Sequence, residues 1–90
     1  MEGKRLILND GTIIERGEAG YAQGALWCYL TGYTMQEASS LFFDRRKTEK
    51  IIFQYGEMQD EYVDYTDCVN ISINVDGVVS VGLKKETGNA

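Results

Sequence analysis

Apolar and polar residues alternate along the C-terminal part of the chain, on both sides of Asp76-Gly77. Alternation with a period of two is typical of a strand with one buried face, and Asp-Gly is a strong hairpin signal. A three-residue loop over 75–77, with Gly77 in the left-handed conformation, keeps one face wholly apolar, whereas a two-residue turn would mix the faces. We therefore predict a hairpin that pairs Ile73 with Val79, Ile71 with Val81 and Val69 with Leu83.

The N-terminal part repeats this pattern around Gly11. Strands over 4–8 and 12–16 are expected to flank a loop over 9–11, because this arrangement again keeps apolar residues together. The segment Leu6-Ile7-Leu8 is apolar on both faces, which indicates either a strand covered on both sides or an edge that meets another subunit. The expected pairs are Leu8 with Thr12, Leu6 with Ile14 and Arg5 with Glu15, the last of opposite charge.

The middle of the chain predicts one strand and one helix. Residues 17–24 contain three glycines and are expected to form a connection with little structure of its own. A short buried strand follows over 25–30. Thr34 and Glu37 have the spacing of a capping box, so a helix is expected to begin there and to end near Phe43. Its apolar stripe consists of Met35, Ala38, Leu41 and Phe42, and residues 44–47 are expected to leave the helix.

Two further strands, over 50–55 and 61–65, are expected to be joined by a loop over 56–60. The whole order is strand, strand, strand, helix and then four strands in two hairpins. It predicts a single α+β domain over residues 1–90, with a mainly antiparallel sheet and one packed amphipathic helix.

Composition limits the environment and the chemistry. A chain of 90 residues buries a small core, for which oligomerisation is a natural remedy, so we expect a homo-oligomer. No apolar run approaches the roughly 18 residues of a membrane span, and the first residues lack a signal-peptide core. The expectation is a soluble, cytoplasmic protein that does not bind a membrane, with Cys28 and Cys68 as reduced thiols.

Histidine is absent, which excludes mechanisms that depend on it as a base or a metal ligand. The net charge of −5 arises from one segment, residues 57–67, which holds five acidic residues and no basic ones. Such a chain is a poor ligand for double-stranded nucleic acid. The acidic spacing does not follow the calcium-loop pattern, and we expect no catalytic residue, no metal and no cofactor.

The basic triplet Arg45-Arg46-Lys47 is the only concentration of positive charge and is a candidate phosphate site. Its alternative is a solvated helix end. Gly20, in the glycine-rich segment, is a candidate for backbone contact with a phosphate. Trp27, Tyr21 and Tyr33 are candidates for stacking on a base, with a place in the core as the alternative.

The acidic segment interleaves tyrosines with carboxylates. It is a candidate protein-binding surface, and its alternative is an edge strand kept soluble by charge. Its candidate residues are Asp60, Glu61, Tyr62, Asp64 and Tyr65.

Residues 6–12 and 50–58, together with the closing Asp76-Gly77 hairpin, resemble small uncharacterised proteins encoded by bacteriophages and prophages. The resemblance implies a context and no site residue, because it covers turn and strand patterns. Small phage proteins of this size are commonly structural accessories or inhibitors of host defence, which act in the cytoplasm of the host cell.

Two non-enzymatic functions follow from these residues. In the first, an oligomeric host-defence inhibitor sequesters a small phosphate-bearing, nucleotide-like signal, held by the basic triplet and the aromatic candidates. In the second, the acidic strand binds a host defence protein, either as a nucleic-acid mimic or by adding its edge to a partner sheet. A virion or tail-assembly accessory protein is a third reading.

Overall fold

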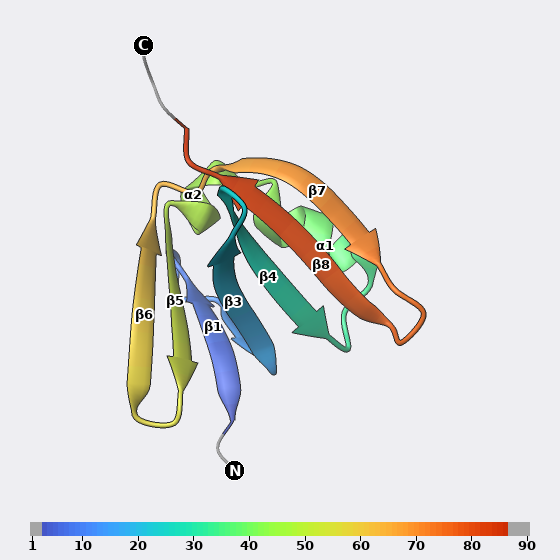
Figure 1. Ribbon diagram of the computed structural model, residues 1–90, viewed down its shortest axis with the longest axis horizontal. Coiled ribbons are helices and arrows are strands. Elements are labelled where there is room, and N and C mark those ends of the chain that lie inside the picture. The colour runs from blue at the N-terminus through green and yellow to red at the C-terminus, as the bar shows by residue number, and fades with distance from the viewer. Residues whose placement is uncertain (1–2, 87–90) are drawn as a thin grey trace.

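The computed structural model describes residues 3–86, which form two four-stranded antiparallel sheets and two short helices (Figure 1). The predicted α+β class with mainly antiparallel strands is confirmed. Sheet A has the strand order β2-β1-β5-β6, and sheet B has the order β3-β4-β8-β7. The elements are β1 (Lys4–Leu8), β2 (Ile13–Glu15), β3 (Gly17–Ala22), β4 (Ala25–Thr31), α1 (Met35–Phe42), α2 (Arg45–Thr48), β5 (Lys50–Tyr55), β6 (Met58–Val63), β7 (Asp67–Ile73) and β8 (Val78–Lys84).

The first hairpin has the predicted register. Arg5 lies opposite Glu15 and Leu6 opposite Ile14, and the Leu8 amide donates to the Thr12 carbonyl at 2.8 Å. Strand β1 is an interior strand of sheet A, between β2 and β5, so it is not an edge.

The second hairpin has the predicted loop, with Gly77 at φ +83°. Ile73 pairs with Val79 and Ile71 with Val81, as predicted. The expected pair of Val69 with Leu83 is wrong, because a bulge shifts the register and places Cys68 opposite Leu83. The bulge inserts one extra residue, so Cys68 packs on the core while Val69 is 49% exposed.

The glycine-rich segment is not a loose connection, since residues 17–22 form β3 and pair with β4 along their whole length. At the start of β3 the two sheets approach closely. A Cβ at Gly17 would lie 2.9 Å from Leu6 Cγ, and Ala19 packs in the core. The sequence pattern suggests flexibility for the whole segment, whereas the packing against β1 requires a glycine at position 17.

Helix α1 begins with the predicted capping box. The Glu37 amide donates to Thr34 Oγ1 at 3.0 Å, and the Thr34 amide donates to Glu37 Oε1 at 2.9 Å. Ala38 and Phe42 are buried against sheet B, but Met35 is 40% exposed, so the buried stripe is shorter than expected.

Residues 45–48, expected to leave the helix, form the short helix α2. The Asp44 side chain caps it by accepting a hydrogen bond from the Arg46 amide at 3.0 Å.

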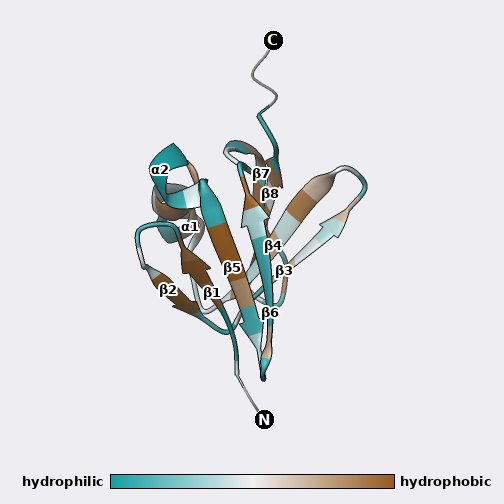
Figure 2. Ribbon diagram, turned by 90° about the vertical axis from the view of Figure 1, so that its left-hand side faces the viewer, coloured by the Kyte–Doolittle hydropathy of each residue, from teal (hydrophilic) through white to brown (hydrophobic). Residues whose placement is uncertain are grey.

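Strands β5 and β6 are joined by a two-residue turn, so the expected loop over 56–60 is wrong. Gly56 takes a positive φ of 61°, which suits a tight hairpin, and β6 starts at Met58 and ends at Val63. Figure 2 shows the consequence for sheet A: β1 and β5 are largely hydrophobic, whereas the edge strand β6 is mostly hydrophilic.

The core lies where the inner faces of the two sheets meet under α1. Leu6, Ile14 and Ile51 from sheet A and Leu26, Leu30 and Val81 from sheet B are all fully buried. This packing leaves the outer faces of both sheets and the edge strand β6 at the surface.

Candidate functional site

Strand β6 forms one edge of sheet A and pairs with β5 alone among the described strands. The turn at 56–57 makes Tyr55 and Met58 a hydrogen-bonded pair, and such pairs alternate along an antiparallel ladder. The backbone N–H and C=O groups of Gln59, Glu61 and Val63 therefore point away from β5. Five of the six residues of β6 are exposed, so this edge is open along its length.

Acidic side chains lie on both faces of this edge. Asp60 lies opposite Phe53 and accepts a hydrogen bond from Tyr55 Oη at 3.1 Å. Glu61 lies on the other face, where its carboxylate is 3.3 Å from Lys50 Nζ with both side chains about half exposed. Both carboxylates thus keep oxygen atoms available to a partner.

Strand β6 ends at Val63, and the next residue, Asp64, has a φ of 71° that turns the chain away from sheet A. The Asp64 amide donates to the Glu49 carbonyl at 2.9 Å, and its own carbonyl accepts from the Glu86 amide at 3.3 Å. The exposed carboxylate of Asp64 therefore stands at a fixed point just after β6.

Tyrosines from three segments meet beside the inner face of β6. Tyr65 contacts Tyr62 edge to face, with ring centroids 6.1 Å apart, and contacts Tyr21 of β3 at 6.2 Å. Lys85 Nζ lies 5.7 Å from the centroid of the Tyr65 ring. Tyr62 and Tyr65 also pack on the core, while Tyr21 is 60% exposed. We call Tyr21, Tyr62 and Tyr65 the tyrosine cluster.

Two phenols of this region, those of Tyr55 and Tyr62, have a raised pKa. The pKa of Tyr55 is raised chiefly because its hydroxyl donates to the Asp60 carboxylate. Partial burial, with the nearby Asp60 charge, raises the pKa of Tyr62. Both hydroxyls are therefore hydrogen-bond donors at neutral pH.

The predicted phosphate-binding triplet is divided among three acidic partners. Arg45 forms an ion pair with Glu86, Arg46 Nε lies 3.5 Å from Asp44, and Lys47 Nζ lies 2.5 Å from Asp10. The Lys47 ammonium, helped by hydrogen bonds from Thr12, holds the pKa of Asp10 well below its usual range. Arg46 is the most exposed of the three cations, and with Lys47, Asn9, Asp10 and Asp44 it lines a shallow depression.

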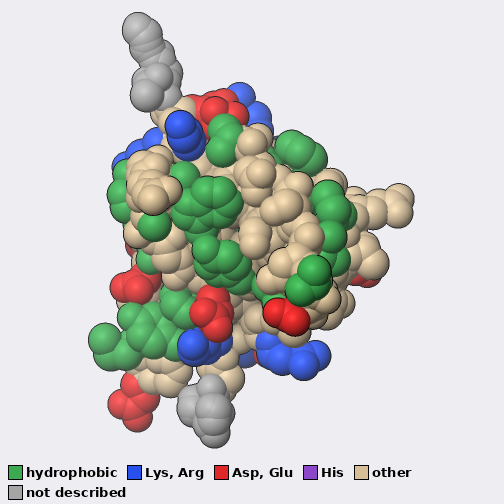
Figure 3. Space-filling view, turned by 45° about the vertical axis from the view of Figure 1, so that its right-hand side comes forward, with side chains coloured by type: hydrophobic (Ala, Val, Ile, Leu, Met, Phe, Trp, Pro, Cys, Tyr) green, Lys and Arg blue, Asp and Glu red, His purple; other side chains and the backbone are tan. Residues whose placement is uncertain are grey.

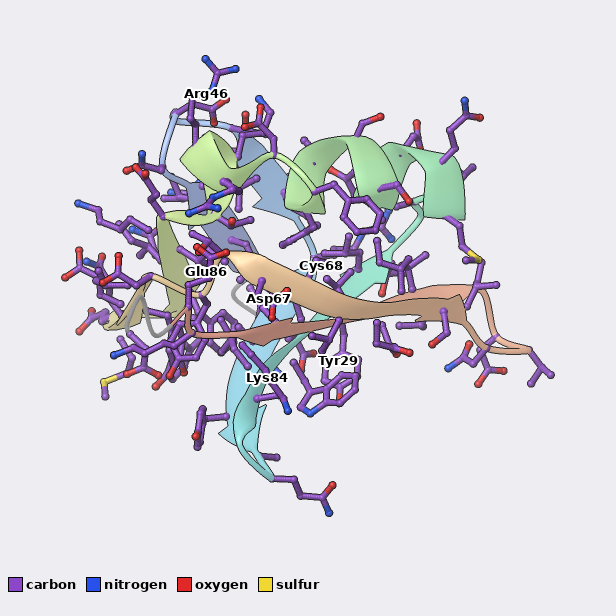
Figure 4. The ribbon with its side chains drawn as sticks, turned by 90° about the horizontal axis from the view of Figure 1, so that it is seen from above. Tyr29, Arg46, Asp67, Cys68, Lys84 and Glu86 are labelled. Carbon is purple, nitrogen blue, oxygen red and sulfur yellow. The ribbon has the colours of Figure 1, made fainter. Side chains whose placement is uncertain are left out.

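The aromatic candidates do not join this triplet within one chain. Gly20 and Trp27 are cross-strand neighbours on the outer face of sheet B, Tyr21 belongs to the tyrosine cluster, and Tyr33 packs on the core. Figure 4 shows Arg46 on the helix side of β7 and β8, and Tyr29, which shares a face with Trp27, on the opposite side. Capture of a nucleotide by all of these residues stays a prediction that needs a second subunit.

The second set of predicted residues lies together. Asp60, Glu61 and Tyr62 belong to β6, and Asp64 and Tyr65 follow it directly. The sequence pattern places Tyr55 with this acidic segment, but it does not include Tyr21 in the surface. The contact of Tyr21 with Tyr65 joins β3 to the segment between β6 and β7 across 44 positions of sequence, and no local pattern signals it.

Other chemistry is sparse among residues 3–86. They contain no group of three or more His, Cys, Asp or Glu residues arranged to hold a metal ion. Cys28 and Cys68 are free thiols, and burial raises the pKa of Cys28 to about 12. Neither α1 nor α2 is long and apolar enough to cross a membrane.

No family model, no curated protein and no solved structure matches this chain.

Proposed function

We propose that this chain is a non-enzymatic binding protein that captures a basic protein through β6 and the adjoining tyrosine cluster. The observation that carries the proposal is the open edge of β6, where outward backbone groups, two carboxylates and Tyr62 occur on one short strand. Edge strands of this kind accept an added strand from a partner.

The charge of this segment defines the class of partner. Residues 57–67 hold five acidic side chains and no basic one, and the rest of the chain carries no net charge. Such a localised field attracts a basic surface and speeds its association. The partner's strand would carry Lys or Arg opposite Asp60 and Glu61.

The tyrosine cluster supplies the part of the contact that does not depend on charge. Tyrosines are enriched at the centres of protein interfaces because they bury a large ring and still offer a hydroxyl. Tyr21, with 60% of its surface exposed, is the ring of this cluster that a partner would cover most.

The biological setting we propose follows the resemblance to phage-encoded proteins. The captured partner would be a nucleic-acid-binding protein of host defence, for which the acidic edge imitates phosphates. A structural accessory of a virion would instead assemble into particles, and electron microscopy of phage lysates separates these two outcomes.

The test is affinity capture from bacterial lysate with the tagged chain, compared with the triple variant Asp60→Asn, Glu61→Gln and Asp64→Asn. Asn at position 64 tolerates the positive φ of Asp64, so the fold is retained. We expect the wild-type chain to retain a basic protein. This protein should elute as the salt concentration rises from about 0.1 M to about 1 M, because the screening length of the electrostatic attraction shortens. The triple variant is expected to retain none.

The matched control removes the same number of acids from other surfaces, with Glu15→Gln, Glu18→Gln and Asp76→Asn. Equal loss of capture in both triple variants would show that net charge alone matters and would refute a site at β6. A second variant, Glu61→Pro, removes one outward N–H from the edge. Unchanged capture by Glu61→Pro would refute strand addition.

A further inference from the structure

The outer face of sheet B is a second exposed surface, on the side of the sheet opposite α1 and α2 (Figure 4). Trp27 and Tyr29 lie on this face because they alternate with the buried residues Leu26, Cys28 and Leu30 along β4. Trp27 is half-buried, and Tyr29 is 41% exposed. Neither ring belongs to the β6 edge.

Glycines flank Trp27 on both neighbouring strands. Gly82 of β8 lies opposite Trp27, and a Cβ there would lie 3.0 Å from Cη2 and Cζ3 of the indole. The six-membered ring therefore covers Gly82 and is held against the sheet. Gly20 of β3 lies opposite Trp27 on its other side, and a Cβ there would meet nothing within 4 Å. The surface over Gly20, beside the fixed indole ring, is therefore open, and we call this space the open step.

Serine and asparagine side chains lie beside the two rings on β7 and β8, and charged side chains lie on β3 and at the end of β8. Ser80 lies opposite Tyr29, and Ser72 lies opposite Ser80. The side-chain amide of Asn70 donates a hydrogen bond to Ser72 Oγ at 3.4 Å. Glu18, opposite Tyr29 on β3, has its carboxylate 3.4 Å from Lys4 Nζ. In the space-filling view the middle of this side of the molecule is uncharged, and charged side chains gather toward its margins (Figure 3).

We propose that this face binds a neutral oligosaccharide. An exposed aromatic ring offers a flat apolar surface that suits the C–H face of a sugar ring, while hydroxyl and amide side chains suit its hydroxyl groups. Trp27 and Tyr29 are two positions apart on one strand, about 7 Å along it, so that neighbouring sugar rings reach one aromatic ring each. The open step over Gly20 admits the edge of the first sugar.

The chemistry of the face favours this ligand over three others. A nucleic acid or a free phosphate needs an excess of cations, whereas this face holds Lys84, on the same side as Tyr29, together with the carboxylate of Glu18 opposite Tyr29 (Figure 4). A proline-rich peptide docks in a groove between aromatic ridges, whereas Trp27 here lies flat over Gly82 and has open space on its other side at Gly20. A second copy of the chain would bring a surface with the same serines and asparagine, which offers few apolar contacts.

The test uses Trp27 as its own reporter, because it is the only tryptophan of the chain. The full-length protein is titrated with soluble oligosaccharides of glucose, xylose and N-acetylglucosamine while tryptophan emission and acrylamide quenching are followed. We expect at least one of them to shift the emission saturably and to protect Trp27 from acrylamide. No response to any of the three sugars would overturn the proposal.

The variant Gly20→Val places a branched side chain in the open space beside Trp27, where a Cβ meets nothing within 4 Å, and it is expected to weaken binding about tenfold. Tyr29→Ser removes the second ring and is expected to have a similar effect, whereas Tyr62→Phe on β6 serves as the matched control and leaves affinity unchanged. Equal affinity of wild type and Gly20→Val would place the sugar elsewhere.

Two other outcomes also overturn the proposal. A proline-rich peptide that protects Trp27 where the sugars do not would identify a peptide-binding face. Protection that rises with protein concentration in the absence of sugar would show that a second copy of the chain covers it.

Discussion

Single side chains fix the loops of this protein through charge and local hydrogen bonds. Asp10, in the first hairpin loop, accepts hydrogen bonds from the Thr12 amide and hydroxyl and from Lys47 of α2. Asn9 beside it donates to the Arg46 carbonyl at 2.9 Å. The loop is therefore tied to a helix 37 positions away in sequence, and the ionised carboxylate of Asp10 is the centre of this contact.

The depressed pKa of Asp10 predicts how stability depends on pH. A carboxyl whose folded pKa is lowered stabilises the protein above its unfolded pKa of about 3.8, and this contribution is lost as pH falls toward the folded pKa. Asp10→Asn is expected to lower Tm at pH 7, and the difference from wild type should shrink below about pH 4. Thermal melts between pH 2 and pH 7 measure it. A difference that is constant with pH would contradict the role given to the charge.

At the scale of elements, local sequence signals account for the turns and the helix start. The capping box of Thr34 and Glu37 is present as predicted. Thr34→Ala removes the acceptor for the Glu37 amide and is expected to lower the free energy of unfolding by about 1 kcal/mol. Urea denaturation measures this change. Ser40→Ala, on the exposed side of the same helix, is the control and should cost little, so equal losses would argue against the cap.

Elements that sequence reasoning missed depend on contacts between distant residues. The register of both hairpins follows from alternation and from one glycine each, which are local. Strand β3 was missed because its glycines and alanines resemble a loop, and the need for glycine at position 17 depends on packing against Leu6 and Ile14 of sheet A. The bulge at Val69 and the two-residue turn at 56–57 depend on which faces the folded sheets bury.

The predicted site residues also fall into two groups: those that local sequence keeps together and those whose meeting depends on packing. The five residues predicted for protein binding are near neighbours in sequence, and a strand with its following turn keeps them together. The residues predicted for nucleotide capture come from four segments, and their meeting depends on how the sheets pack. Local pattern carries no information on that packing, so the basic triplet and Trp27 were joined without a structural basis.

For the whole molecule, the close contact between the sheets is the main constraint. Gly17 of β3 faces Leu6 and Ile14 of sheet A, and an added Cβ would lie 2.9 Å from Leu6 Cγ and 3.2 Å from Ile14 Cγ2. Gly17→Ala is expected to lower the free energy of unfolding by about 1 to 3 kcal/mol because both buried side chains must move. Gly20→Ala on the same strand, with open space at its Cβ, is the matched control. Equal effects in denaturant titrations would contradict this view of the packing.

The packing of the two sheets also explains why β6 is available for binding. Sheet B and α1 cover the inner faces of the central strands, but β6 extends sheet A to an edge whose residues are mostly exposed. The five acidic residues that account for the net charge of −5 lie in residues 57–67, in β6 and the segments that flank it. The open edge is therefore also the most negatively charged part of the chain.

Hydrogen exchange on β6, with and without the captured basic partner, tests this account most directly. The amides of Gln59, Glu61 and Val63 point away from β5 and should exchange rapidly in the free protein. Strand addition predicts that all three become protected in the complex, while the amides that bond β5 change little. Unchanged exchange at these three amides in a complex formed by the wild-type chain would show that the partner does not add to β6.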